Sequence, residues 1–396
     1  MHVFTLFAGP CVTHCHLLNV GSFNSVYKRY KIENNNPISL STLRKNTPIQ
    51  YKRARKQTDL CEYCEMEPTL TKRLKHIQQQ EHESKDENEK KMFNMHIGTI
   101  NDTLSFINHH KQIATQQRLT FQNQRKTLSL SQCIILFDFK ENIKVGEGPR
   151  ETGRDFYGKS QRSVLGFVVY FKQNGEIKQR FYHFVSEILS HDGLFVRDCI
   201  NQLLDLEFFR RFNEIFFWTD CGPHFRNFEV LNHTLFEVPC KFDVFTTHNY
   251  FGEKHGKGPC DSEFSVLTQW LSEITSHTRI QTTAALLTAL RNKSKENVSI
   301  GGLNRVFIQY ARDARPPHCH HAKFEGLLSF HQLRKAGANT VACKVSDTSN
   351  KVNIVQVSKR TVKDKRKDKV APQVRVQYEQ PGPKTMAAWR NALQHL

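Results

Sequence analysis

Five apolar segments between residues 131 and 250 predict the strands of one buried β-sheet. The first, SQCIILFDFK (131–140), is an almost unbroken apolar run, which is typical of a central strand covered on both faces. The other four predicted strands are similarly rich in Val, Ile and Phe and span residues 164–172, 177–185, 213–220 and 241–250. The sequence NGE at 174–176 lies between the second and third strands and predicts a hairpin turn.

Amphipathic segments alternate with the later strands and predict helices. They span residues 191–212, 224–237 and 261–275, and the first and third place their apolar side chains on one face at helical spacing. The order of elements is therefore three strands, a helix, a strand, a helix, a strand and a helix. This order predicts a mixed five-stranded sheet flanked by helices, in the α+β or α/β class.

The composition of the chain changes along its length and predicts five regions. Residues 70–130 are rich in Gln, Lys, Glu and Leu with few helix breakers, so this part is expected to be helical. The regions are a basic N-terminal segment (1–60), a C-x2-C and helical region resembling a zinc finger (61–130), the sheet domain (131–275), a C-terminal extension (276–345) and a basic tail (346–396). The N-terminal segment is either a small helical DNA-binding segment or a basic linker.

The net charge of +19 is distributed unevenly. Residues 1–130 carry a net charge of +8, residues 131–275 carry −4 and residues 276–396 carry +15. Basic flanks favour a polyanionic partner, because each phosphate contact releases counterions, and an acidic centre favours a site for divalent cations. The alternative is that the flanks are solvated faces and tails. The lysine-rich run at 359–369 is either a nuclear localisation or phosphate-binding segment, or a solvated tail.

The composition also excludes several classes of protein. Aromatic residues make up 11% of the chain, which argues against a wholly disordered protein. The 11 cysteines are odd in number and widely scattered, so we expect a reducing compartment rather than a secreted disulfide scaffold. No apolar run reaches the roughly 18–20 residues of a membrane span, and the N-terminus lacks the basic segment of a signal peptide.

Acidic residues stand at the ends of three predicted elements. Asp138 and Asp220 lie at the ends of the first and fourth strands, and Asp261, with Glu263 close by, begins the last helix. In a mixed sheet these two strands can be neighbours, and a helix across the sheet can supply a third carboxylate. Three close carboxylates repel one another unless cations neutralise them, so they predict a site for two Mg²⁺ or Mn²⁺ ions. The alternative is that they are turn residues and a helix cap.

Two short motifs flank these acids. Cys221 and His224, at C-x2-H spacing after Asp220, either shape the site or simply begin a helix, and we favour the second interpretation. The HGKG sequence at 255–258 is either a flexible loop or a phosphate-binding loop whose glycines let backbone approach the ligand. The candidate nucleic-acid-binding residues are Lys254, His255 and Lys257 in and beside this loop and Arg53, Arg55 and Lys56 in the basic run YKRARK.

A second metal site is predicted near residue 61. The pattern Cys61-x2-Cys64-x11-His76-x5-His82 places two cysteines on a tight turn and two histidines on a following helix, a set of ligands that suits tetrahedral Zn²⁺. Other histidines that could replace the last two are His96, His109 and His110. The alternative is a pair of reduced surface thiols.

The order of elements and three motifs together resemble cut-and-paste DNA transposases of the DDE or DDD type, which have a ribonuclease H-like catalytic core. The motifs are DFKEN (138–142), TDCGPHF (219–225) and HNYFGEKHGKGPCDSEF (248–264). TDLCEYC (58–64) fits transposase-like proteins in which a cysteine pair precedes the core, and the resemblance covers roughly residues 39–275.

This resemblance implies catalytic, metal-binding carboxylates at Asp138 and Asp220. The third is either Asp261, favoured by the GKGPCD context, or Glu263, which helical geometry places within the apolar face of its helix. The resemblance further implies two Mg²⁺ or Mn²⁺ ions, double-stranded DNA as partner, a homo-oligomer and a nuclear location. We therefore expect a transposase, or a protein derived from one, that hydrolyses phosphodiester bonds and transfers strands. The alternatives are a non-catalytic, zinc-containing DNA-binding protein and a ribonuclease H-like nuclease.

Overall fold

The computed structural model divides the chain into two units, residues 1–60 and 61–396. In the first unit, β1 (Cys15–Leu17) pairs in parallel with β2 (Tyr51–Arg53), and two short helices, α1 (Phe23–Glu33) and α2 (Leu40–Asn46), lie between them in the sequence. The structure describes residues 15–17, 23–34, 36–46, 51–53, 60–146, 148–150, 152–153, 158–256, 258–299, 304–314, 318–320, 324, 327–346, 350–357 and 360–362.

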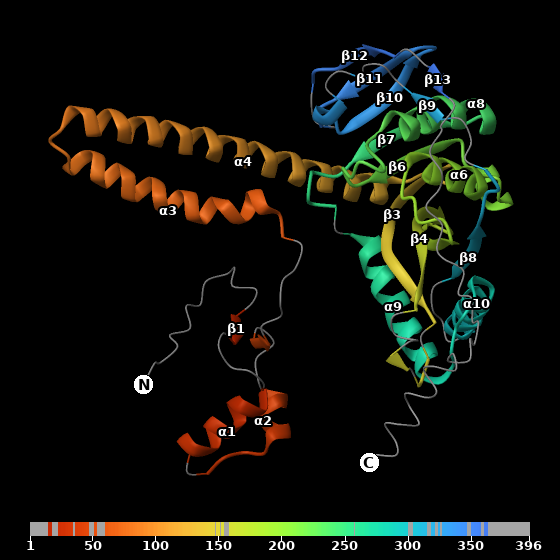
Figure 1. The fold of residues 1–396 in the computed structure, drawn as a ribbon, viewed down its shortest axis with the longest axis horizontal. Helices are drawn as coiled ribbons and strands as arrows, with labels where there is room; N and C mark the ends of the chain where they lie inside the picture. The colour runs from red at the N-terminus through yellow and green to blue at the C-terminus, as the bar shows by residue number, and fades with distance from the viewer. Residues whose placement is uncertain are drawn as a thin grey trace, which may run out of the picture. The chain divides into compact units, whose positions relative to one another are not determined.

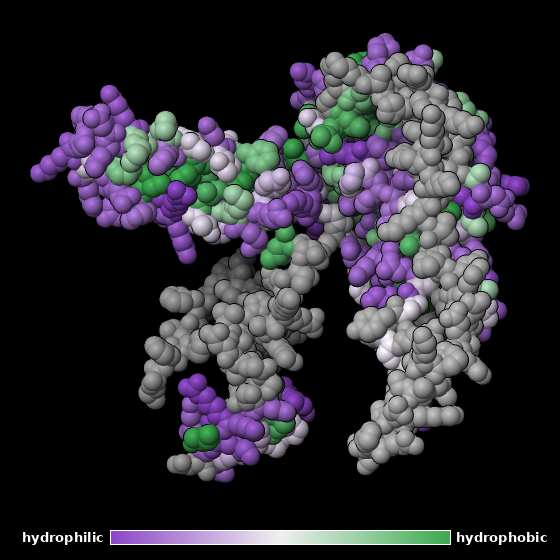
Figure 2. All heavy atoms as spheres, viewed as in Figure 1, coloured by the Kyte–Doolittle hydropathy of each residue, from purple (hydrophilic) through white to green (hydrophobic). Residues whose placement is uncertain are grey.

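The second unit begins with a helical hairpin, which confirms the helices predicted over 70–130. Helix α3 (Glu62–Glu83) runs antiparallel to the long helix α4 (Glu87–Thr127), as Figure 1 shows. Hydrophobic side chains gather along the seam between the helices and hydrophilic ones surround it (Figure 2). Near the C-terminal end of α4, the Phe121 ring packs edge-on against Trp218, with 5.3 Å between the ring centroids. This contact holds the end of the helix on the sheet.

The centre of the second unit is a mixed sheet of nine strands in the order β12-β11-β10-β7-β6-β3-β4-β5-β8. Strands β3, β4 and β5 form an antiparallel meander, and β6 and β7 continue the sheet in parallel with β3. The strands are β3 (Gln132–Val145), β4 (Ser160–Gln173), β5 (Glu176–Ser186), β6 (Glu214–Thr219), β7 (Phe245–Tyr250), β8 (Arg305–Tyr310), β10 (Gln332–Gly337), β11 (Thr340–Lys344) and β12 (Asn353–Gln356).

The five predicted strands and their order are confirmed, although β3 continues past Asp138 to Val145 and β7 begins only at Phe245. The prediction of a sheet limited to five strands is wrong. β8 adds in parallel to β5 at one edge, and β10, β11 and β12 add as an antiparallel meander beside β7 at the other. These strands come from residues 276–356, which were expected to form an extension and a tail. They are short and only partly buried, so the sequence lacks the long apolar runs of the central strands.

Helices cover both faces of the sheet (Figure 1). On one face, α6 (Gly193–Leu204) packs its apolar side on the odd-numbered positions of β3, such as Phe137. On the other face, α9 (Pro259–His277), α10 (Thr283–Ser299) and the end of α4 cover the even-numbered positions, such as Leu136. The π-helical turn His233–Glu237 joins α7 (Phe228–Asn232) to α8 (Val238–Phe242). Among the described helices, none has the length and apolar character needed to span a membrane.

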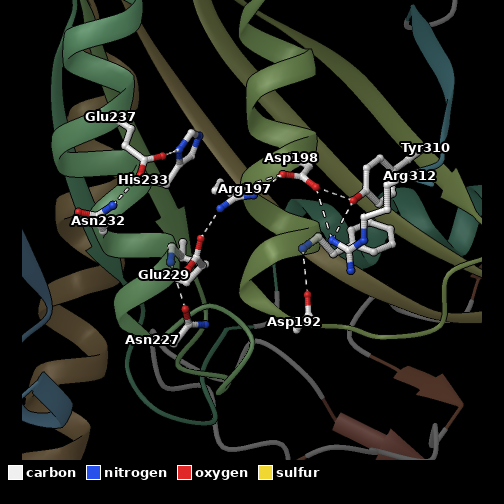
Figure 3. Close-up of polar contacts among 12 residues, drawn as sticks. Asp192, Arg197, Asp198, Asn227, Glu229, Asn232, His233, Glu237, Tyr310 and Arg312 are labelled. Carbon is white, nitrogen blue, oxygen red and sulfur yellow. Dashed lines mark hydrogen bonds and ion pairs between the residues drawn. The ribbon is translucent and has the colours of Figure 1, made fainter. Parts of the chain in front are cut away.

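A largely buried polar network ties α6 to its neighbours (Figure 3). Arg197 donates to Glu229 at 2.7 Å and also forms an ion pair with Asp198 at 3.1 Å. Asp198 in turn accepts a hydrogen bond from the hydroxyl of Tyr310, the last residue of β8, at 2.8 Å. These charged groups compensate one another, so we regard the network as a structural element that joins α6, α7 and β8.

Candidate active site and metal centre

Asp138 and Asp220 lie level with each other on adjacent parallel strands. Leu136 of β3 pairs with Trp218 of β6, so each aspartate follows the last paired residue by two positions. One ligand atom each from Asp138, Asp220 and His224 lie within 4.8 Å of one another. The structure therefore brings together the two acids for which the sequence predicted a shared site.

The cluster is electrostatically unfavourable for bare carboxylates. Burial, followed by the negative charges of Asp220 and Asp261, raises the pKa of Asp138 to about 7. Within the described part of the chain, no lysine or arginine forms an ion pair with any of these three aspartates. A divalent cation would relieve the repulsion, because hard oxygen donors of this kind suit Mg²⁺ and Mn²⁺.

Asp261 stands in the first turn of α9 and its charge raises the pKa of Asp138, but it is not one of the three residues whose ligand atoms lie within 4.8 Å of one another. Its Oδ2 accepts a hydrogen bond from the backbone N–H of Gly258, the N-cap residue of α9, at 2.8 Å, which is one of the two bonds of a capping box. The neighbouring Cys260 Sγ lies 3.9 Å from the carbonyl oxygen of Leu136, so the start of α9 is held against β3. The carboxylate of Asp261 therefore both caps α9 and acts electrostatically on Asp138.

Glu263 is excluded as the third carboxylate, which corrects one of the two alternatives. Its side chain is only 3% exposed, and Arg305 of β8 donates to its two oxygens at 2.6 and 2.8 Å. His183 Nε2 lies 3.1 Å from the same carboxylate. Burial works to raise the pKa of Glu263, but these hydrogen bonds and charges hold it below its usual value. Glu263 therefore belongs to a buried ion pair that fastens α9 to the sheet.

His224 joins the acid cluster, so its interpretation as a mere helix-start residue is wrong. Its ring packs edge-on against that of Phe139, with 5.4 Å between the ring centroids. Burial lowers its pKa, although the charge of Asp220 opposes this effect. Cys221 turns away instead: its thiol donates to the carbonyl oxygen of Phe251 at 3.1 Å. The C-x2-H motif therefore contributes its histidine to the acid cluster, but not its cysteine.

A second cluster joins four residues from three parts of the second unit. Cys61 is the N-cap of α3 and Cys64 lies in its first turn, His110 is on α4, and His255 is in the loop between β7 and α9. Cys61 Sγ lies 3.2 Å from His110 Nε2, and Cys64 Sγ lies 3.4 Å from His255 Nε2. The two histidine Nε2 atoms are 3.0 Å apart. All four ligand atoms lie within 4.8 Å of one another.

This geometry corrects the predicted histidine ligands. His76 and His82 are exposed on α3, a continuous helix that leads away from the two cysteines. At about 1.5 Å of rise per residue, His76 is roughly 18 Å along the helix from Cys64. Of the three alternative histidines, His110 is the one that reaches the cysteines. The fourth member, His255, was expected to contact phosphate, and its sulfur neighbours place it in this cluster instead.

The structure locates the other predicted nucleic-acid contacts only in part. Lys254 forms an exposed ion pair with Glu62 at 2.7 Å. A Cβ added at Gly256 would lie 2.7 Å from the Cβ of Asp220, so this glycine allows a close approach to the aspartate. The candidates outside the described residues or side chains are Lys257, Arg53, Arg55 and Lys56.

Comparison with known protein families identifies the family of this chain. Residues 116–349 match a family model described as a domain of unknown function, DUF8701. This range covers more than half of the chain and contains the three aspartates, His224 and His255, whereas Cys61, Cys64 and His110 precede it. No curated protein and no solved structure matches the chain. The chain therefore belongs to the DUF8701 family.

Proposed function

We propose that this protein is a DNA transposase, or a protein derived from one, that cleaves and joins phosphodiester bonds with the help of bound divalent cations. The observation that carries the proposal is the proximity of Asp138 on β3 and Asp220 just after the adjacent strand β6, with the charge of Asp261 acting on the same site. Acids on the first strand, the fourth strand and the late helix are the arrangement expected of a ribonuclease H-like core. The order of the central elements agrees with that expectation.

The residues of the cluster suit phosphoryl transfer. Asp138, Asp220 and Asp261 would hold Mg²⁺ or Mn²⁺, which supplies Lewis-acid activation of the attacking oxygen and stabilisation of the leaving oxygen. His224 adds a ring that burial keeps neutral near pH 7, able to accept or donate a hydrogen bond at the reacting phosphate. Glu263 and Arg305 hold α9, and with it Asp261, at a fixed position against the sheet.

The charge of the chain favours DNA as the substrate. The regions on either side of the acidic sheet domain carry net charges of +8 and +15, which attract a phosphate backbone. In the transposase scheme a freed 3′-hydroxyl attacks target DNA, and two element ends must be brought together. We therefore propose double-stranded DNA as partner, an assembly of at least two copies and a nuclear location.

The test is a cleavage and strand-transfer assay with the full chain, labelled linear DNA, a supercoiled plasmid and Mn²⁺ or Mg²⁺. We expect labelled DNA to become joined to the plasmid by the wild type and by Asp102→Asn, which changes an exposed aspartate on α4, but not by Asp138→Asn. Products that are cut but never joined would support the nuclease. Equal signals from wild type and Asp138→Asn, or none from either despite DNA binding, would reject catalysis by this cluster and support the DNA-binding alternative.

A further inference from the structure

We propose that Cys61, Cys64, His110 and His255 bind one structural Zn²⁺ ion, which fastens the α3–α4 hairpin to the loop that contacts Asp220. This inference is independent of the proposed function, because it concerns a different set of ligands and is tested without measuring catalysis. The four residues come from the start of α3, the middle of α4 and the loop before α9, so no local sequence motif contains them all.

The distances fit a tetrahedral zinc site. Zn²⁺ binds thiolate sulfur at about 2.3 Å and histidine nitrogen at about 2.0 Å, so its ligand atoms lie roughly 3.3–3.8 Å apart. The observed separations are 3.2 Å and 3.4 Å for the two sulfur–nitrogen pairs and 3.0 Å for the nitrogen pair, so one is within this range and two are slightly shorter than it. Cys61 and His110 are buried and Cys64 and His255 are partly buried, as expected of a closed structural site rather than of surface thiols.

The cluster connects directly to the acid site through a short loop. A Cβ at Gly252 would lie 2.6 Å from the Cα of Ala114, one turn of α4 beyond His110, so loop and helix are in close contact. The N–H of His255 donates to the carbonyl oxygen of Gly252 at 2.9 Å. The next residue, Gly256, lies against the side chain of Asp220. A metal bound to His255 would therefore fix the backbone that touches a candidate catalytic carboxylate.

Zinc content of the purified full chain tests the ligand set. We expect about one zinc ion per chain in the wild type and in His76→Gln, His82→Gln and Cys240→Ser, which change exposed residues of the same types. Cys64→Ser and His255→Gln should retain roughly a tenth of that or less. A wild-type zinc content of about a tenth of an ion per chain or less would overturn the proposal. A loss of zinc in His76→Gln as large as that in Cys64→Ser would also overturn it.

Two further measurements keep the test decisive if the ligand variants fail to fold. Wild-type protein reconstituted with Co²⁺ should show the absorption of a tetrahedral site with thiolate charge transfer, and an octahedral spectrum would contradict the assignment. Hydrogen exchange should then rise in residues 251–256 when zinc is chelated, while β3 and β6 stay protected. Unchanged exchange in this loop would overturn the connection between zinc and the Asp220 side of the site.

Discussion

Asp138 and Asp220 stand level on neighbouring parallel strands, because Leu136 is paired with Trp218 two residues before them. Their ligand atoms and that of His224 share a space less than 4.8 Å across. Burial, followed by the negative charge of Asp220, raises the pKa of Asp138, and a bound cation would relieve the repulsion between the carboxylates. The predictions below follow from this arrangement and from the contacts around it.

Divalent cations should stabilise the wild type and not Asp138→Asn. Binding to the folded state alone adds about 2.7 kcal/mol to the free energy of unfolding when the cation is at 100 times its Kd. Thermal unfolding with and without Mn²⁺ measures this gain, and Asp102→Asn is the matched control. An equal Mn²⁺-induced shift in Asp138→Asn would show that the ions bind elsewhere.

Without divalent cations, the folded protein should lose stability as the pH rises from about 4 to about 7. The folded-state pKa of Asp138 is raised to about 7, so the folded state holds a proton that the unfolded state releases near pH 4. The associated stabilisation, on the order of a few kcal/mol, is present at low pH and lost through pH 7. Denaturant unfolding at several pH values should show a shallower dependence for Asp138→Asn. Parallel profiles for the two proteins would contradict the raised pKa.

Glu263→Gln should destabilise the fold by about 3–5 kcal/mol, because it removes the buried carboxylate charge that the guanidinium of Arg305 contacts through two hydrogen bonds. The double variant Glu263→Gln with Arg305→Met should recover much of this loss, since both charges are then absent. A double-mutant cycle from urea unfolding measures the coupling. The folded double variant should still bind Mn²⁺. If the double variant were as stable as the wild type but no longer bound Mn²⁺, Glu263 would be a metal ligand after all.

His224→Ala should weaken Mn²⁺ binding or metal-dependent cleavage by at least about tenfold, because it removes a member of the acid cluster. Cys221→Ser is the control, since the Cys221 thiol points to Phe251 and away from the cluster. Calorimetric titration with Mn²⁺ separates the two variants. If His224→Ala and Cys221→Ser bound Mn²⁺ with equal affinity, His224 would have no part in metal binding.

Gly256→Ala should disturb the acid site through packing alone. The added Cβ would lie 2.7 Å from the Cβ of Asp220, so backbone or carboxylate must move. At Gly258 the nearest atom is 3.6 Å away, an ordinary contact, and Gly258→Ala should therefore cost only a modest loss of helix capping. Mn²⁺ affinity should fall in the first variant and stay near the wild-type value in the second. The reverse order would argue against close packing of the loop on Asp220.

The sequence predicts the central strands and points to Asp138 and Asp220 because their signals are local, although Asp138 lies within β3 and not at its end. Long apolar runs mark buried strands, and an acid at each run's end is placed by the strand itself. The cluster of Cys61, Cys64, His110 and His255 and the partner of Glu263 depend on tertiary contacts that no spacing rule contains. His255 meets His110 because the loop before α9 packs on α4, and Arg305 reaches Glu263 because β8 joins the far edge of the sheet. The sequence favours histidines near the cysteines, yet the continuous α3 helix carries His76 and His82 away from them.

The most direct test of the central claim is anomalous X-ray scattering from crystals of the full chain grown with Mn²⁺. We predict a manganese peak at about 2.1 Å from carboxylate oxygens of both Asp138 and Asp220, with Asp261 in the same coordination environment. Manganese bound elsewhere in the crystal, with no peak between these two aspartates at saturating concentration, would contradict the account.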